Sequence, residues 1–385
     1  MNNLSLLDDV VISRKNRAIN LLKKYDVDGW LVISSGNDVN AEYLVGTKVY
    51  GTITILLLRD SLTVLVSKLE ESMVRRKGVD EIMSYYGSKE LITKLMELLS
   101  RVEGGKIFVN IAPPLLAPYA SRILYSHERI IRSLAQLYGV DLIPAHKYVW
   151  ELRSIKTNEE LEALEQAVKA TVEAINTVLE RVKIGMREKE VAAELYREIY
   201  RQGTPSFETI VAFGVNSANP HHKTSDKKLR VGEVGYIDVG IKLYSMCADI
   251  TRAFFTENVD EEFYTIYSIV HEAQNASIEI IREGILAKEP DKVAREVIEK
   301  NKYDPEKVFT HGLGHPIGVE VHDVGPVLSF LARPKHVLKE NMTETVEPAI
   351  YIENKGGIRL EDDIIVKKHG VVRLSKSPEE PYIVK

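Results

Sequence analysis

VGYIDVGIKLYSMCADITRAFF, residues 234–255, contains two strand-like runs separated by a turn near Lys242 to Ser245. Asp238 and Asp249 lie 11 residues apart, so a turn in this segment predicts that they face each other across an antiparallel pair. Opposed side chains there have Cβ atoms about 5 Å apart, and like charges destabilise the pair. Two buried aspartates therefore need a cation between them, or one must hold a proton. The alternative is that one aspartate caps the turn while the other pairs with Arg252.

A second hairpin of the same kind is expected at ETVEPAIYIENKGGIRLEDDIIV, residues 344–366. Residues 354–357 form its turn, and the flanking strands carry Glu347 and Glu361, 14 residues apart. Two surface glutamates on an edge hairpin would give the same pattern. The apolar neighbours of both glutamates favour half-burial instead, and two acidic hairpins in one region indicate a shared site.

Histidines cluster in the same region. Five of the ten histidines lie in two short segments: His311, His315 and His322 in FTHGLGHPIGVEVH, and His221 and His222 in ANPHHK. A lone buried histidine is more often a satisfied core residue than a ligand. Clustering of this kind favours a functional site.

Four carboxylates and one imidazole would make a ligand set of hard oxygen donors with one nitrogen. That set suits Mn²⁺, Co²⁺ or Zn²⁺ better than Ca²⁺ or a lone Mg²⁺. Four carboxylates also balance the charge of two divalent cations. Two metals about 3.5–4 Å apart can lower the pKa of a shared water and polarise a carbonyl.

The remaining composition bounds the class of protein. The chain has 385 residues, 44% hydrophobic and 28% charged, with a formal net charge of −5. No Lys/Arg block stands out, which argues against a nucleic-acid or anionic-membrane surface. No apolar run of about 18 residues predicts a membrane span, and the N-terminus has no signal-peptide pattern. The single cysteine, Cys247, excludes an intramolecular disulfide and suits a reducing compartment, so we expect a cytoplasmic protein.

The length suits two domains, which we place at residues 1–150 and 151–385. The first is predicted as α/β, with helices at 16–26 and 88–102 and strands at 29–34, 52–58, 62–67 and 106–111; residues 112–118 are expected to be a loop. The second opens with a capping box, Thr157 and Glu160, ahead of a long amphipathic helix. Further helices are predicted at 187–202, ending at Gly203, and at 259–283, ending at Gly284. Helices covering a curved antiparallel sheet, an α+β arrangement, fit this half.

The combination resembles the pita-bread metallopeptidases, a family that includes methionine aminopeptidase, aminopeptidase P and prolidase. LRSIKTNEELEALEQAV (152–168) and SSGNDVNAEYLVG (34–46) extend the resemblance over almost the whole chain. The resemblance implies five metal ligands: Asp238, Asp249, His315, Glu347 and Glu361. It implies that Asp238 binds one metal, that His315 and Glu347 bind the other, and that Asp249 and Glu361 bridge them.

The resemblance also implies roles around the metals. Glu347 would shuttle a proton, and His221 and His322 would hold the substrate carbonyl and the developing oxyanion. His311 and Arg359 would lie behind the ligands, with Arg359 orienting Glu361 unless it is a plain surface arginine. His222 is expected to be solvated, Cys247 to be packing, and Arg333 to be a candidate for the substrate carboxylate. Two departures from the family pattern are Ala349 after Glu-Pro and Asn341 before Met342, where glycine is usual.

Within the family, the N-terminal domain argues against a simple methionine aminopeptidase, and GHPIGVEVHDVG is most similar to prolidases. The expected function is hydrolysis of the Xaa-Pro bond in dipeptides with two divalent ions per subunit, Mn²⁺ or Co²⁺ first and Zn²⁺ as a third option. The family's homodimer is expected too. The alternatives are an aminopeptidase P acting on longer peptides, a metal-free creatinase-like amidinohydrolase, and a non-catalytic pita-bread binding protein.

Overall fold

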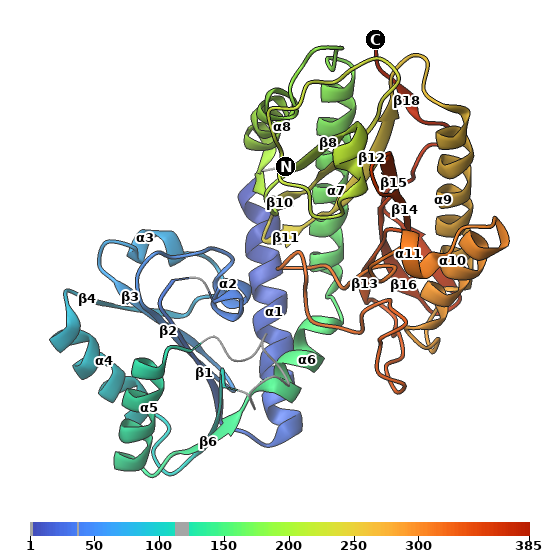
Figure 1. Cartoon of the computed structure of the whole chain (residues 1–385). Coiled ribbons are helices and arrows are strands. Elements are labelled where there is room, and N and C mark those ends of the chain that lie inside the picture. The colour runs from blue at the N-terminus through green and yellow to red at the C-terminus, as the bar shows by residue number, and fades with distance from the viewer. Residues whose placement is uncertain (1–2, 37, 112–122) are drawn as a thin grey trace. The chain divides into compact units, whose positions relative to one another are not determined.

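The computed structural model describes residues 3–36, 38–111 and 123–385, and the chain forms two compact units (Figure 1). The first comprises Met1–Arg153 and Thr157–Glu159, and the second comprises Ser154–Lys156 and Glu160–Lys385. The loop predicted at 112–118 lies outside the described residues. Within the described residues, no helix combines the length and apolarity needed to cross a bilayer.

The first unit is built on a mixed six-stranded sheet in the order β4-β3-β2-β1-β5-β6. Its strands are β1 Gly29–Ser34, β2 Ile53–Leu58, β3 Leu62–Ser67, β4 Glu81–Tyr85, β5 Lys106–Val109 and β6 Asp141–Pro144. Its helices are α1 Asn3–Tyr25, α2 Val39–Val45, α3 Glu71–Val74, α4 Ser88–Ser100, α5 Tyr125–Leu137 and α6 His146–Ser154. The predicted α/β strands are therefore confirmed to within a few residues.

The first helix is longer than predicted. It begins at Asn3 rather than at residue 16. Val10, Val11, Ala18 and Leu22 are buried at helical spacing, so the apolar face continues through the earlier turns. Adjacent β-branched valines obscure that period in the sequence, because such residues favour strands locally.

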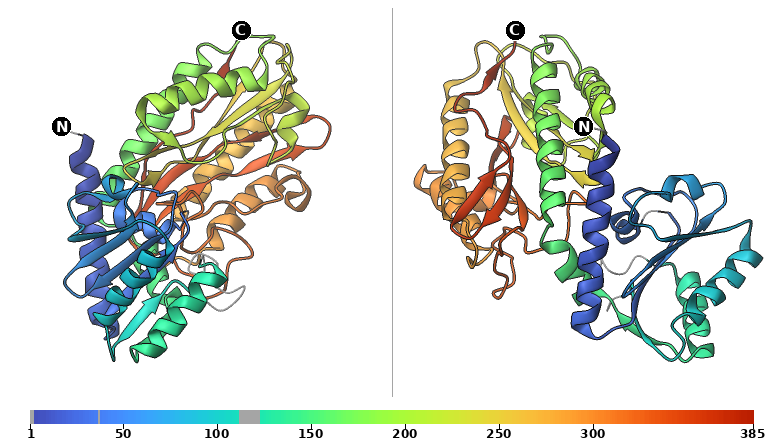
Figure 2. Two further views of the ribbon diagram at one scale, coloured as in Figure 1. Left: turned by 90° about the vertical axis from the view of Figure 1, so that its left-hand side faces the viewer. Right: turned by 180° about the vertical axis from the view of Figure 1, so that it is seen from behind.

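The second unit has helices over several small, mostly antiparallel sheets, and the predicted α+β class is confirmed. Its helices are α7 Asn158–Leu179, α8 Glu188–Gln202, α9 Glu261–Ile280, α10 Glu289–Lys300, α11 Pro305–Val308 and the 3₁₀ turn η2 Gly214–Ala218. Its strands are β7 Thr204–Pro205, β8 Ile210–Phe213, β9 Val234–Val239, β10 Ile241–Leu243, β11 Met246–Cys247, β12 Ile250–Phe255, β13 Thr343–Val346, β14 Ala349–Ile352, β15 Gly356–Arg359, β16 Asp362–Lys367, β17 Gly370–Arg373 and β18 Tyr382–Ile383. Figure 2 shows these strands enclosed by helices within this unit.

Of two predicted helix ends, one is confirmed and one is wrong. α8 ends at Gln202 with Gly203 as its C-cap, as predicted. The third predicted helix was too long, because α9 ends at Ile280 and not at Gly284. Ile281 has extended backbone and is buried, and Glu283 N donates to Lys367 O at 3.0 Å. The chain leaves the helix to bond with the end of β16 before it reaches the glycine.

The first acidic hairpin has a different register from the predicted one. β9 and β12 pair Asp238 with Thr251, so Asp249 lies two residues away along the strand direction rather than opposite Asp238. The turn centres on Tyr244 and Ser245, which have φ of 50° and 63°. Positive φ at both central residues is typical of a type I′ turn, which usually takes Asn-Gly. Because neither residue signals that turn, the sequence mislocates its centre by one position.

The second acidic hairpin brings its two glutamates opposite each other as predicted, but its turn is at residues 353–355 and not 354–357, because Gly356 and Gly357 belong to β15. Val346 pairs with Asp362 and Ala349 pairs with Arg359. Both pairs keep one register, which places Glu347 opposite Glu361 between them. Helix α9 packs its apolar face, including Ile266 and Val270, in the same core as these strands.

Candidate metal centre

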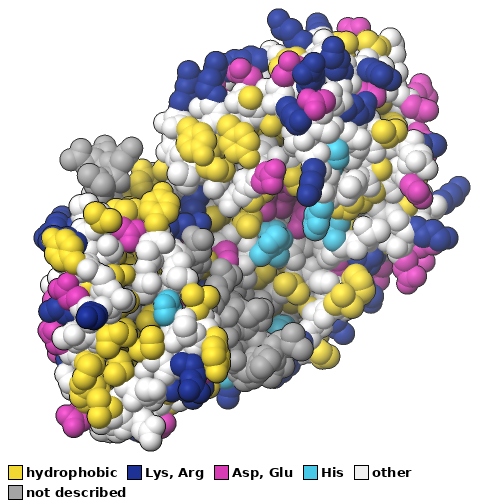
Figure 3. All heavy atoms as spheres, turned by 60° about the vertical axis from the view of Figure 1, so that its left-hand side comes forward, with side chains coloured by type: hydrophobic (Ala, Val, Ile, Leu, Met, Phe, Trp, Pro, Cys, Tyr) yellow, Lys and Arg dark blue, Asp and Glu magenta, His cyan; other side chains and the backbone are white. Residues whose placement is uncertain are grey.

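Four of the proposed ligands converge in the second unit. One ligand atom each from Asp249, His315 and Glu361 lies within 4.8 Å of the others. His315 Nε2 is 3.5 Å from Asp249 Oδ2 and 3.6 Å from Glu347 Oε1. The fifth, Asp238, is close enough for its charge to raise the pKa of Asp249, Glu347 and Glu361 after the larger effect of burial. Figure 3 shows histidine and acidic side chains gathered on one face of this unit.

The carboxylates of this group lack enough internal partners. Asp238 and Asp249 are 7% and 6% exposed, yet Oδ1 of each has no hydrogen-bond partner among the described residues. Buried carboxylate oxygens without donors are costly unless a cation binds them. Oxygen donors with one imidazole nitrogen fit a divalent transition metal. The residues present therefore fit the metal that the sequence predicts.

The protonation of the cluster follows from burial. Burial, and then the neighbouring carboxylates, raise the pKa values of Asp249 and Glu361 well above the usual range. Burial raises the pKa of Glu347 to about 8. Burial and the charge of His322 lower the pKa of His315 to about 3, so its imidazole is neutral and can offer a lone pair. Without a cation the site retains protons, and a cation would displace them.

Arg359, which the resemblance assigns to orienting Glu361, makes its ion pair with Asp238. Its buried guanidinium forms an ion pair with Asp238 Oδ2 and donates from Nη1 to Tyr351 OH at 2.8 Å. Arg359 Nε also donates to Thr251 Oγ1 at 3.1 Å, and Thr251 Oγ1 donates to Glu361 Oε2 at 2.8 Å. Thr251, which register places opposite Asp238, therefore links Arg359 to Glu361 by hydrogen bonds.

Two site residues escaped the sequence reasoning. Thr251 lies two residues after Asp249, on the same strand face, and that spacing is the signal that could have found it. Tyr351 OH lies between Arg359 and His311, whose Nε2 is 3.1 Å away. Burial lowers the pKa of His311 to about 4. His311 Nδ1 lies 4.0 Å from Oε2 of Glu347, a proposed ligand.

The two histidines assigned to substrate lie at the edge of the cluster. The His322 ring packs edge-on against His315 with ring centroids 4.1 Å apart. His221 is exposed. Beyond the effect of burial, the charge of His221 contributes to lowering the pKa of His311 and of His322, so His221 is within electrostatic reach of both.

His222 is not solvated, contrary to the sequence prediction. Its Nε2 lies 2.8 Å from Glu188 Oε2. The fully buried Glu188 carboxylate also accepts hydrogen bonds from Phe213 N, Asn216 Nδ2, Ser225 N and Ser225 Oγ. Glu188, the first residue of α8, thus anchors both ends of the segment that carries His221. No sequence signal near residue 188 indicates a partner 34 residues away.

The other predicted residues lie outside this network. Arg333 is exposed, and no contact among the described residues joins it to the ligand cluster. Cys247 is buried, with Sγ 3.6 Å from Val319 O, as expected of a packing residue. Asn341 has φ of 64°, a left-handed conformation that glycine adopts freely and asparagine tolerates. Asparagine can therefore replace the family's usual glycine there.

Comparison with known proteins places this geometry in context. Residues 162–368 match the sequence model of metallopeptidase family M24. The chain is similar to the Xaa-Pro dipeptidase of Pyrococcus furiosus, with 31% identity over 95% of this chain and 99% of that protein. An X-Pro aminopeptidase structure from Thermotoga maritima has a TM-score of 0.83 and 30% identity, covering 95% of this chain and all of that one. A dipeptidase structure from Pyrococcus horikoshii has a TM-score of 0.81 and 31% identity, covering 96% and 100%.

Proposed function

This chain belongs to metallopeptidase family M24, and on that premise we propose that it is a prolidase, which hydrolyses the Xaa-Pro bond of dipeptides at a centre of two divalent metal ions. The enzyme class and the pita-bread fold expected from the sequence are confirmed by the family match and the solved relatives. The dipeptide substrate, the number of ions and the role of each residue are the proposal.

The observation that carries the proposal is the convergence of carboxylates from two hairpins on one imidazole, with carboxylate oxygens left unpaired. The proposed ligands are Asp238, Asp249, His315, Glu347 and Glu361. Mn²⁺ or Co²⁺ is the expected metal, with Zn²⁺ as the third option. When bound, a metal pair would lower the pKa of a shared water to supply the nucleophile and would polarise the scissile carbonyl.

The side chains around the ligands have proposed roles in the same reaction. Glu347 relays a proton to the prolyl nitrogen as the general acid–base group. His322 and His221 donate hydrogen bonds to the substrate carbonyl and the oxyanion that develops from it. Arg333 is proposed to bind the substrate carboxylate. The proposal also includes a homodimer and a cytoplasmic location.

The test is replacement of two ligands, Asp249→Asn and Glu361→Gln. Metal-free protein would be reconstituted separately with Mn²⁺, Co²⁺ and Zn²⁺, and proline release from Xaa-Pro dipeptides would be measured. Each substitution should lower activity by at least about 100-fold, since even partners behind the ligands commonly matter by about 10–100-fold. Glu353→Gln, at an exposed position of the same hairpin, is the matched control and should change little. Unchanged activity in either ligand variant would refute the proposed centre.

A second candidate is an Xaa-Pro aminopeptidase, favoured by the likeness to the Thermotoga maritima structure. Such an enzyme would cleave Xaa-Pro-Yaa peptides as well as, or better than, dipeptides. The same reconstituted protein assayed on both substrates decides between the two. A ratio of kcat/KM above one in favour of the tripeptide would replace the dipeptidase assignment.

A further inference from the structure

The backbone ladder of the second hairpin is open where Glu347 and Glu361 face each other. Glu347 N donates outside the hairpin, to Leu313 O at 2.7 Å. Glu361 N also donates outside it, to Thr251 O at 3.2 Å. The next residue, Pro348, has no N–H to donate, and its carbonyl accepts only a long hydrogen bond, from Leu360 N at 3.4 Å. The two glutamates therefore lie in a gap between the β13–β16 and β14–β15 pairings.

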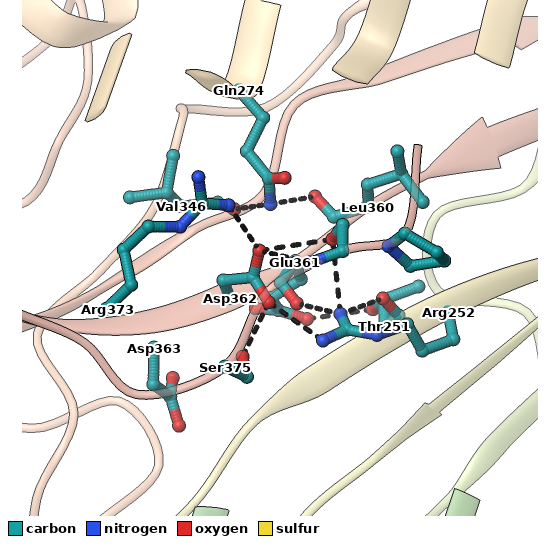
Figure 4. A network of polar contacts seen from close by, with 12 residues as sticks. Thr251, Arg252, Gln274, Val346, Leu360, Glu361, Asp362, Asp363, Arg373 and Ser375 are labelled. Atoms are coloured by element: carbon teal, nitrogen blue, oxygen red, sulfur yellow. Dashed lines mark hydrogen bonds and ion pairs between the residues drawn. The ribbon is translucent and has the colours of Figure 1, made fainter. Parts of the chain in front are cut away.

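One side chain spans that gap. Gln274 of α9 is fully buried, and its Nε2 donates to Val346 O at 3.0 Å and to Leu360 O at 3.2 Å (Figure 4). Each of these carbonyls belongs to the residue that precedes a glutamate. The carbonyl of Val346 shares a peptide group with Glu347 N, and the carbonyl of Leu360 shares one with Glu361 N. By binding both carbonyls, the Gln274 amide therefore holds the backbone of both glutamates.

Gln274 uses the two N–H donors of its amide and not its acceptor oxygen. Gln274 Oε1 is buried without a hydrogen-bond partner among the described residues, and a buried unpaired acceptor is destabilising. Its neighbours on α9, Val270 and Ala273, are buried and apolar. An apolar side chain would fill this place without that cost. The planar NH₂ group of Gln274 supplies two N–H donors, one for each carbonyl, and so links them.

We propose that Gln274 is a positioning residue that sets the separation of Glu347 and Glu361 and so the geometry of the metal centre. This inference rests on the proposed function. Glu361 is held on its other side by β12, because Arg252 Nη1 donates to its carbonyl at 2.6 Å and Thr251 donates to its carboxylate. Glu347 has no comparable contact from β12 among the described residues, so the Gln274 bridge adds a side-chain link between the strands of the two glutamates to the backbone bond from Leu360 N to Pro348 O.

The test compares Gln274→Met and Gln274→Glu with wild type. Methionine keeps the length and removes both donors, and a glutamate side chain can donate at most one proton. Calorimetric titration would give the number and affinity of bound Mn²⁺ ions, and electron paramagnetic resonance would report the coupling between them. Gln274→Met should weaken Mn²⁺ affinity by about 10–100-fold, as loss of a residue supporting a ligand commonly does. It should also weaken the coupling and lower kcat more than it changes KM.

The matched control is Ser277→Ala, which removes a buried hydrogen bond from the same helix to Pro290 O, away from the glutamates. It should lower Tm but leave Mn²⁺ affinity within twofold of wild type. Mn²⁺ affinity, coupling and kcat unchanged in Gln274→Met, or in Gln274→Glu if the first does not fold, would overturn the inference even if Tm falls. Wild type is the separate test of the proposed function: failure to bind two ions or to release proline would reject that function, whereas the variant-to-wild-type ratios judge Gln274.

Discussion

Replacing Arg252 by methionine should lower the free energy of unfolding of the second unit by about 3–5 kcal/mol, the usual cost of removing one partner of a buried ion pair. Arg252 Nη2 and Asp362 Oδ1 are 2.8 Å apart, with side chains 3% and 0% exposed (Figure 4). Arg252 Nη1 also donates to the carbonyls of Thr251 and Glu361. Its loss would take the Arg252 donor from the buried Glu361 carbonyl, beside the proposed metal centre.

The structure supports that magnitude. Burial alone would raise the pKa of Asp362, but Arg252, Ser375, Ser377 and Arg373 lower it from 3.8 to about 2. A difference of about 2 pKa units corresponds to about 2.5 kcal/mol in favour of the folded state at neutral pH. Loss of Arg252 removes part of this stabilisation, since Arg373 still pairs with Asp362, and adds the cost of the Glu361 carbonyl that loses its donor.

The assay is chemical unfolding followed by far-ultraviolet circular dichroism. Both tryptophans, Trp30 and Trp150, lie in the first unit, so their fluorescence reports that unit separately. The double variant Arg252→Met with Asp362→Leu should cost less than the sum of the single variants. Glu296→Gln, which breaks an exposed pair with Lys292, is the control and should cost less than about 1 kcal/mol.

The pH dependence of the free energy of unfolding gives a second test of the same prediction. Because the folded-state pKa of Asp362 is depressed, its stabilisation is present above about pH 4 and is lost as the pH falls through about 2. The cost of Arg252→Met should be constant between pH 5 and 8 and smaller at pH 3. A cost below about 1 kcal/mol at pH 7, or an unchanged cost at pH 3, would refute the reasoning.

Three further predictions concern the site. Glu188→Gln should lower kcat by about 10-fold through loosening of the His221 segment, a loss that persists at saturating substrate, and an unchanged kcat would count against this role. Metal-free protein should lose thermal stability as the pH rises from 6.5 to 8. The folded-state pKa of the Glu347 carboxyl is raised to about 8, so this group favours the folded state only while it is protonated. Added Mn²⁺ should reverse the loss, and a Tm that does not change with pH would count against the prediction. Arg333→Ala should raise KM for Xaa-Pro dipeptides without lowering kcat if Arg333 binds the substrate carboxylate, and unchanged KM would remove that assignment.

Local patterns in the sequence determined the fold class, most strands and the pairing of Glu347 with Glu361. These features depend on periodicity and on the length of one turn, which neighbouring residues encode. The same reasoning misplaced Asp249 relative to Asp238. Tyr244 and Ser245 both adopt positive φ in the turn, a conformation that their residue types do not predict. A shift of the turn centre by one residue was enough to make Thr251, and not Asp249, the residue opposite Asp238.

Only the tertiary structure decided how buried polar groups pair. Arg359 binds Asp238, 121 residues away, and His222 binds Glu188 rather than water. Gln274 spans the hairpin gap from a helix 72 residues before the nearer strand carbonyl. Hydrogen-bonding capacity is a property of the single residue, whereas its partner depends on which distant segments pack together and exclude water.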